Sequence, residues 1–145
     1  MPVVRYHRKV PSDTRSQLVD ALRIKEYATP YCWHGETPEN EGVQVDLLIP
    51  ATAERADYIC EMKFSEGKYI LKDSDAEDIT DRISALRNSK VHKPAHSIYV
   101  AYVTTFGVSE SKHRSHINDI VTLDELFSPV LHFNARNDTR LKNYS

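Results

Sequence analysis

The sequence predicts a single mixed α/β domain, because strand-like apolar runs alternate with helical patterns along a chain of 145 residues. Hydrophobic residues make up 40% of the chain and charged residues 28%, proportions typical of a soluble protein with a packed core. This length holds one core of ordinary size, and no shift in composition marks a second domain. We expect the domain to span residues 1–127, with a basic arm at residues 1–11 and a polar tail at residues 128–145.

Two helices are expected from their capping residues and apolar spacing. The first covers residues 14–26, where Thr14 and Gln17 stand at capping-box spacing before apolar positions. The second follows a capping box at residues 74–77, with an acidic first turn and basic residues towards its end, as the helix dipole favours. Its apolar residues recur on one face, at Ala76, Ile79, Ile83 and Leu86.

The strands are expected where β-branched and aromatic residues gather, at residues 31–33, 43–49, 57–64, 96–103 and 120–122. Pro50 should end the second of these strands, because proline has no amide hydrogen to donate to a ladder. Residues 51–56 form a connection short enough for a hairpin between the second and third strands. A helical turn at residues 123–127 should follow the last strand.

Composition and termini limit the function classes. The apolar runs are far too short to cross a bilayer, and the charged N-terminus lacks the apolar core of a secretory signal, so we expect a cytoplasmic protein without a membrane contact. Cys32 and Cys60 lie in apolar surroundings and are interpreted as reduced core thiols. The net charge of -2 gives no general attraction to nucleic acid, which leaves local basic patches as the means of binding phosphate.

Two acids stand inside predicted strands, Asp46 and Glu61, where a buried carboxylate is costly unless a partner or a metal compensates it. Lys63 lies two residues after Glu61, so an extended strand presents both side chains on one face. If the two strands pair as a hairpin, Asp46 also reaches that face. Two carboxylates beside an ammonium suit a hard divalent ion and phosphodiester hydrolysis. The alternative is an edge hairpin with an ion pair across one face.

Several ordered motifs resemble one known family. They are residues 42–49, which contain Asp46, residues 60–65, which contain Glu61 and Lys63, and then residues 103–107 and 121–127. Together they resemble the PD-(D/E)xK nuclease-like domain found at the C-terminus of many prokaryotic AAA-type ATPases, over residues 18–127.

This resemblance implies a restriction-endonuclease-like fold, in which a mixed central β-sheet is flanked by α-helices. Asp46 and Glu61 would bind Mg²⁺ or Mn²⁺, and Lys63 would be the catalytic lysine of a DNA nuclease. An ATPase is the implied partner protein. A homodimer is a further expectation, because cutting two strands needs two sites.

The chain also departs from the family pattern. The family usually has a further acid on its first helix, commonly Glu, but residues 5–9 contain none, so Asp13 and Asp20 are the candidates for a supporting acid. The chain contains no phosphate loop of the Gly-x-x-x-x-Gly-Lys-Ser/Thr type, which excludes ATP hydrolysis by that route. The alternative function is therefore a catalytically inactive nuclease-fold module that binds nucleic acid or a protein partner such as an ATPase.

Basic and aromatic residues supply candidate contacts to nucleic acid. A rim that steers a phosphate backbone is expected from Arg82, Arg87, Lys90, Lys93, Lys112 and Arg114. A solvated helix face explains the first group, Arg82 to Lys93, about as well. Tyr69, Trp33 and Tyr102 are candidates for stacking on bases, although aromatic residues in strands are usually part of the core.

Overall fold

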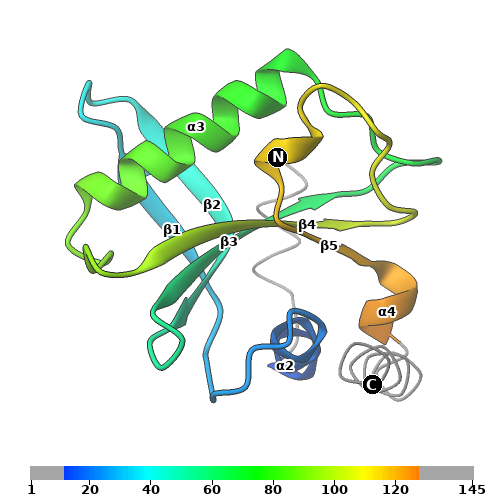
Figure 1. Cartoon of the computed structure of the whole chain (residues 1–145), viewed down its shortest axis with the longest axis horizontal. Coiled ribbons are helices and arrows are strands. Elements are labelled where there is room, and N and C mark those ends of the chain that lie inside the picture. The colour runs from blue at the N-terminus through cyan, green and yellow to red at the C-terminus, as the bar shows by residue number, and fades with distance from the viewer. Residues whose placement is uncertain (1–11, 128–145) are drawn as a thin grey trace, which may run out of the picture.

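A five-stranded mixed sheet forms the centre of the protein, in a computed structural model that describes residues 12–127 and their side chains from residue 15 onward (Figure 1). The strands stand in the order of the chain: β1 (Tyr31–Glu36), β2 (Gly42–Ala51), β3 (Ala56–Lys63), β4 (Ser97–Thr104) and β5 (Asp119–Thr122). The pairs β1–β2 and β2–β3 are antiparallel, whereas β3–β4 and β4–β5 are parallel. The predicted mixed α/β class is confirmed.

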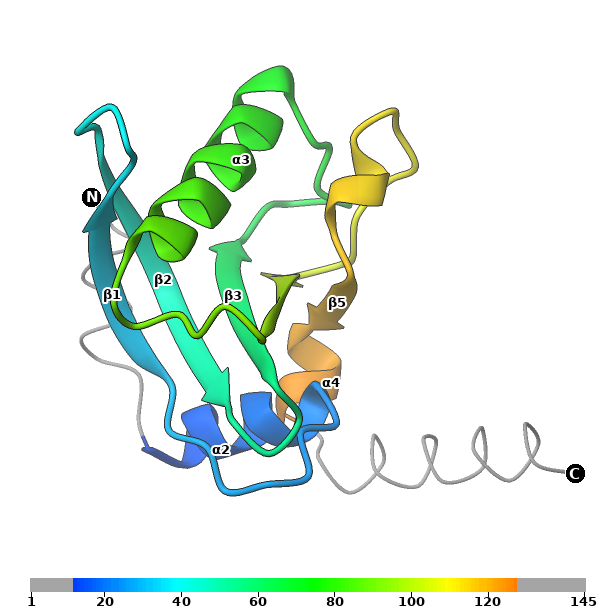
Figure 2. The ribbon, with the colours of Figure 1, turned by 60° about the vertical axis from the view of Figure 1, so that its left-hand side comes forward.

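Helices cover both faces of the sheet (Figures 1 and 2). Helix α3 (Asp73–Asn88) lies across one face, and α2 (Ser12–Ala21) and α4 (Leu123–Phe127) lie on the other. A 3-10 turn, η1 (Arg114–His116), precedes β5. Among the described residues no helix is long and apolar enough to cross a membrane.

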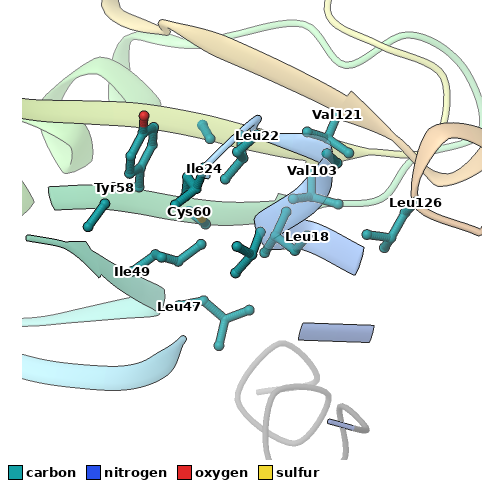
Figure 3. Close-up of a cluster of buried hydrophobic side chains, with 14 of the residues drawn as sticks. Leu18, Leu22, Ile24, Leu47, Ile49, Tyr58, Cys60, Val103, Val121 and Leu126 are labelled. Atoms are coloured by element: carbon teal, nitrogen blue, oxygen red, sulfur yellow. The ribbon is translucent and has the colours of Figure 1, made fainter. Parts of the chain in front are cut away.

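Alternation along the strands divides the core into two sides. Leu47 and Ile49 of β2 face α2 and α4, together with Leu18 and Leu126 from those helices (Figure 3). Leu48, between the two strand residues, packs instead with Leu86 of α3. Because successive side chains of a strand point to opposite faces, a sheet covered on both sides needs nearly continuous apolar strands.

The predicted hairpin between β2 and β3 is confirmed. The two strands pair from Ala51 and Ala56 onward, and the amide of Arg55 donates to the carbonyl of Thr52 at 3.0 Å. Arg55 has a φ of 54° in the left-handed region, which a tight turn requires. This connection sets the register that brings Asp46 towards Glu61.

The helix ends differ from the prediction. Helix α2 ends at Ala21 rather than at residue 26, because Arg23 turns left-handed with φ 62° and Ile24 donates its amide to Val19 at 3.1 Å. Helix α3 begins at Asp73, and the predicted capping box at residues 74–77 is wrong. The carboxylate of Asp75 accepts the amide of Lys72 at 2.9 Å instead.

Two predictions about the strands are also wrong. Pro50 lies within β2, opposite Asp57 of β3. The ladder with β1 extends only as far as Leu48, so Pro50 has a neighbouring strand on one side only and its missing amide hydrogen is tolerated. Cys60 is buried as expected, but Cys32 is exposed on the edge strand β1. The polar tail and the basic arm lie outside the described residues.

Gly35 leaves room for the indole of Trp33, two residues away on the same face of β1. A β-carbon at Gly35 would lie 2.2 Å from the nearest atom of that ring. We predict that Gly35→Ala lowers the free energy of unfolding by about 1–3 kcal/mol through overpacking. Urea unfolding followed by the fluorescence of Trp33, the single tryptophan, measures this change. Gly42→Ala is the matched control, because a β-carbon there meets nothing within 4 Å; equal effects of the two substitutions would contradict the prediction.

Candidate functional site

Asp46 and Glu61 lie together where the ladder between β2 and β3 ends. The last paired residues are Leu47 and Cys60, and the register then places Asp46 opposite Glu61. Beyond this pair, hydrogen bonds between backbone amides and side-chain carboxylates take the place of the main-chain ladder. The carboxylate of Asp46 accepts the amide of Met62 at 2.9 Å, and the amide of Asp46 donates to Glu61 Oε2 at 3.4 Å. Asp46 is 5% exposed and Glu61 1%, so the fold brings two buried carboxylates side by side.

Helix α3 adds a cation to this pair. Arg82 Nη2 lies 3.4 Å from Glu61 Oε1, while Arg82 Nε donates to the carbonyl of Gln44 at 2.8 Å. A further contact joins Arg82 Nη1 to Asp78 at 3.9 Å. Arg82 was expected at a phosphate-steering rim, but the structure turns its guanidinium towards the sheet. Its charge lies beside the carboxyl of Glu61 and lowers the pKa of that group.

The environment of Glu61 favours its protonated form. Burial raises the pKa of this carboxyl most, the charge of Asp46 raises it further, and Arg82 and Lys63 lower it, with the result that the pKa rises from 4.5 to about 8. At neutral pH the carboxyl therefore retains a proton. A cation that binds both acids would stabilise the ionised form and release that proton.

Lys63 ends β3 and shares the face of Glu61, but its nearest ion-pair partner is another acid. Lys63 Nζ lies 3.7 Å from Asp75 Oδ1, in the first turn of α3. Asp75 is buried and also accepts the hydroxyl of Tyr69 at 2.9 and 3.0 Å. Burial and this hydrogen bond raise the pKa of Tyr69. Sequence reasoning assigned Asp75 to a helix cap, and no pattern along the chain indicated its contact with Lys63.

A buried hydroxyl lies close to the same groups. Tyr102 pairs with Glu61 in the parallel register of β3 and β4, and its side chain is fully buried. Its hydroxyl has no hydrogen-bond partner among the described residues. Burial, followed by the charges of Asp75 and Glu61, raises the pKa of Tyr102, so this group stays a donor. Buried hydroxyls in proteins normally find a partner, so an unpaired hydroxyl at this position is energetically costly.

Of the two candidate supporting acids, only Asp20 has a described side chain, and its helix lies away from this group. Asp20 lies on α2, which packs on the opposite face of the sheet from Arg82 and α3. Asp13 also lies in α2, but its side chain is outside the description. The charges that shift the pKa of Glu61 come from Asp46, Arg82 and Lys63.

The remaining rim residues form two separate groups. Arg87, Lys90 and Lys93 are exposed at the end of α3 and in the loop that follows it. Lys112 is exposed and contacts Asp73 at 3.3 Å, whereas the guanidinium of Arg114 donates to the carbonyl of Ile117 at 2.9 Å. The structure therefore does not bring the expected rim together as one basic surface.

The two carboxylates fit a divalent cation in one specific way. Within residues 12–127, no group of three or more His, Cys, Asp and Glu side chains is placed to hold a metal. Mg²⁺, however, is commonly bound by only one or two carboxylates, with waters and substrate phosphate oxygens completing its shell. Asp46 and Glu61 supply this minimal donor set, and both contacts of Glu61 are long, at 3.4 Å.

Comparisons of the chain with protein-family models, with curated proteins and with solved structures found no match. The geometry of Asp46, Glu61, Lys63 and Arg82 is therefore the basis for a proposed function. The family resemblance of the sequence motifs remains an expectation.

The raised pKa of Glu61 predicts a specific pH dependence of stability. The folded state keeps the proton up to about pH 8, whereas the unfolded carboxyl loses it near 4.5, so the free energy of unfolding should fall as pH rises between these values. The contribution of one group is at most ~1.4 kcal/mol per pH unit. We expect Glu61→Gln to remove this contribution and to be more stable than the wild type above pH 8.

Urea unfolding at a series of pH values measures the difference between variant and wild type. Glu77→Gln is the control, because Glu77 is exposed on α3, the helix that also carries Arg82. This substitution should leave the pH profile unchanged. Parallel profiles for wild type and Glu61→Gln would contradict the buried, protonated state of Glu61.

Proposed function

We propose that this protein is a divalent-metal-dependent nuclease that hydrolyses phosphodiester bonds of DNA. The observation that carries the proposal is the placement of Asp46 opposite Glu61 at the end of a β-ladder, with Lys63 on the same face. The element order of helix, three strands, helix and strand supports a restriction-endonuclease-like arrangement. Buried paired acids are costly, so their presence at one point of the fold favours a functional role.

Each residue has a distinct role in this proposal. Asp46 and Glu61 would hold Mg²⁺ or Mn²⁺, which supplies Lewis-acid polarisation of the phosphate and a more acidic bound water. The ammonium of Lys63 stabilises negative charge on the phosphate. Asp75 orients Lys63 from the first turn of α3, and Arg82 orients Glu61 from the middle of the same helix. Helix α3 thus positions both the ammonium of Lys63 and the carboxyl of Glu61.

A second candidate function is a catalytically inactive module that binds nucleic acid or a protein partner. The contact between Arg82 and Glu61 favours it, because a guanidinium beside an acid can compensate that acid without a metal. In that case Asp46, Glu61 and Arg82 form a structural polar cluster. Cleavage and metal binding distinguish the two candidates.

The nuclease proposal predicts loss of cleavage in Lys63→Ala. A labelled DNA in single-stranded, duplex and branched forms is incubated with Mg²⁺ or Mn²⁺, and the rate should fall by at least ~100-fold because charge stabilisation at the phosphate is lost. Lys68→Ala is the matched control, since Lys68 is an exposed lysine in the loop after β3. A wild type that cuts none of the three substrates would overturn the proposal and favour the inactive module.

Metal binding should be measurable without cleavage. We expect Mn²⁺ to raise the thermal unfolding temperature of the wild type, because only the folded state brings the two carboxylates together. At a Mn²⁺ concentration of 100 times the Kd, the free energy of unfolding should rise by about 2.7 kcal/mol. Asp46→Asn should abolish most of this rise, whereas Asp124→Asn, at an exposed position of α4 on the opposite side of the sheet, should not. Equal responses of all three proteins would assign the ion to another place.

A further inference from the structure

The guanidinium of Arg82 lies between two acids, one buried and one exposed. Arg82 Nη2 is 3.4 Å from Oε1 of Glu61, which lies in the sheet, and Arg82 Nη1 is 3.9 Å from Oδ2 of Asp78, one turn earlier in α3. The side chain of Glu61 is almost fully buried, whereas that of Asp78 is 52% exposed. The guanidinium therefore has an inner and an outer ion-pair partner at the same time.

One hydrogen bond anchors the guanidinium between these acids. Arg82 Nε donates to the carbonyl of Gln44 in β2 at 2.8 Å. The two Nη atoms are held less firmly, because their separations from Glu61 and Asp78 exceed the usual length of an N–H···O hydrogen bond. A small rotation about the Cδ–Nε bond thus shortens one of these two contacts and lengthens the other.

Arg82 Nη1 is also the less satisfied of the two Nη atoms. It is buried, and no residue within the described part of the chain accepts a hydrogen bond from it. A buried N–H group without an acceptor is costly, more so when it belongs to a charged side chain. A movement towards Asp78 supplies an acceptor for Nη1, so the position beside Glu61 is one of two favourable positions for the guanidinium.

The inner position of the guanidinium conflicts with a divalent cation at the paired acids. Arg82 Nη2 faces Oε1 of Glu61, and the amide of Asp46 faces Oε2, so both oxygens of this carboxyl already have neighbours. A divalent ion held by Asp46 and Glu61 brings two positive charges beside a third. Like charges at this range repel, and a buried site screens the repulsion less than water does. Arg82 therefore opposes metal binding while it remains beside Glu61.

The ammonium of Lys63 is placed differently from this guanidinium. Lys63 Nζ is 3.7 Å from Asp75, in the first turn of α3, so its ion pair is with an acid outside the carboxylate pair. Arg82, in contrast, pairs with one of the two acids that a metal would need. The two cations of the site thus have separate functions.

We propose that Arg82 regulates the metal site by competing with the divalent cation for Glu61, and that Asp78 accepts the guanidinium when the cation binds. The inference rests on the proposed function, because it concerns the regulation of the same site. Before the ion binds, Arg82 compensates the buried acids. Its shift towards Asp78 then reduces the repulsion and gives Nη1 a hydrogen-bond acceptor.

Mn²⁺ binding in the absence of nucleic acid tests this competition, with the EPR signal of the free ion as the measurement. Arg82→Gln should bind Mn²⁺ about 10-fold more tightly than the wild type, a change of the size that a neighbouring charge produces in a proton equilibrium. Arg87→Gln is the matched control, because it removes the same charge from an exposed position in the last turn of α3 and should leave the affinity unchanged. A folded Arg82→Gln variant with unchanged or weaker binding rules out the competition, since a residue that only orients Glu61 would strengthen the site.

Asp78→Asn tests the outer position. Because this substitution keeps the guanidinium at Glu61, Mn²⁺ binding should weaken by about 2-fold, the modest effect expected of an exposed i,i+4 pair. Glu77→Gln removes the adjacent exposed charge and should have no effect. When Arg82 is already replaced by Gln, Asp78→Asn should also have no effect. An equal effect in both backgrounds would mean that Asp78 acts through its charge alone, which excludes its role as acceptor.

Thermal unfolding shows whether each variant is folded. If Arg82→Gln does not fold, the comparison of Asp78→Asn with Glu77→Gln decides: weaker Mn²⁺ binding by the first alone supports the competition, and equal binding rejects it.

The outcomes also separate the competition from the nuclease proposal. If the wild type binds Mn²⁺ through Asp46 but Arg82→Gln has the same affinity, the metal site stands and the competition fails. If neither protein binds the ion, both proposals fail. Binding that appears only in Arg82→Gln supports the competition and assigns the wild type to the inactive module. Because no step requires hydrolysis, the cleavage result for Lys63 is independent of this test.

Discussion

The carboxylate of Glu61 sets the main constraint on this fold. It lies in an almost fully buried position beside a second acid, Asp46, and a low-dielectric interior penalises both charges. The protein compensates them in three ways: the amide of Met62 donates to Asp46, Arg82 approaches Glu61, and the raised pKa allows Glu61 to keep a proton. The packing of α3 on the sheet, the end of the ladder and the charge state of the site are therefore linked.

Helix α3 connects the site to the rest of the molecule. Its apolar side chains pack on the sheet, and this packing fixes the positions of Asp75 and Arg82 beside Lys63 and Glu61. Asp75 contacts Lys63 and the backbone of Lys72, which ties the start of the helix to the charge at the end of β3. A shift of this helix would change the surroundings of the lysine and the acid together. Rigid elements hold such sites more accurately than loops do.

The β2–β3 hairpin and the predicted pairing of the acids followed from local patterns. The β2–β3 hairpin was predictable because a short connection separates two strand-like runs, and the same reasoning placed Asp46, Glu61 and Lys63 near one another. The predictions failed at residues whose environment depends on the position or length of a neighbouring strand. Cys32 is exposed because β1 is an edge strand, and Pro50 is tolerated because β1 has ended alongside it. Strand order and strand length relative to neighbours are not visible in a single segment.

Periodicity and short spacings along the chain were enough to predict the mixed α/β class and the approximate positions of the strands and the long helix. They also predicted that two acids and a lysine lie near one another. The contacts of Arg82 with Glu61 and of Asp75 with Lys63, in contrast, form only when the elements pack together. These contacts join residues from different elements. They depend on how α3 and the loops pack against the sheet, and that packing is set by the whole core rather than by any local pattern.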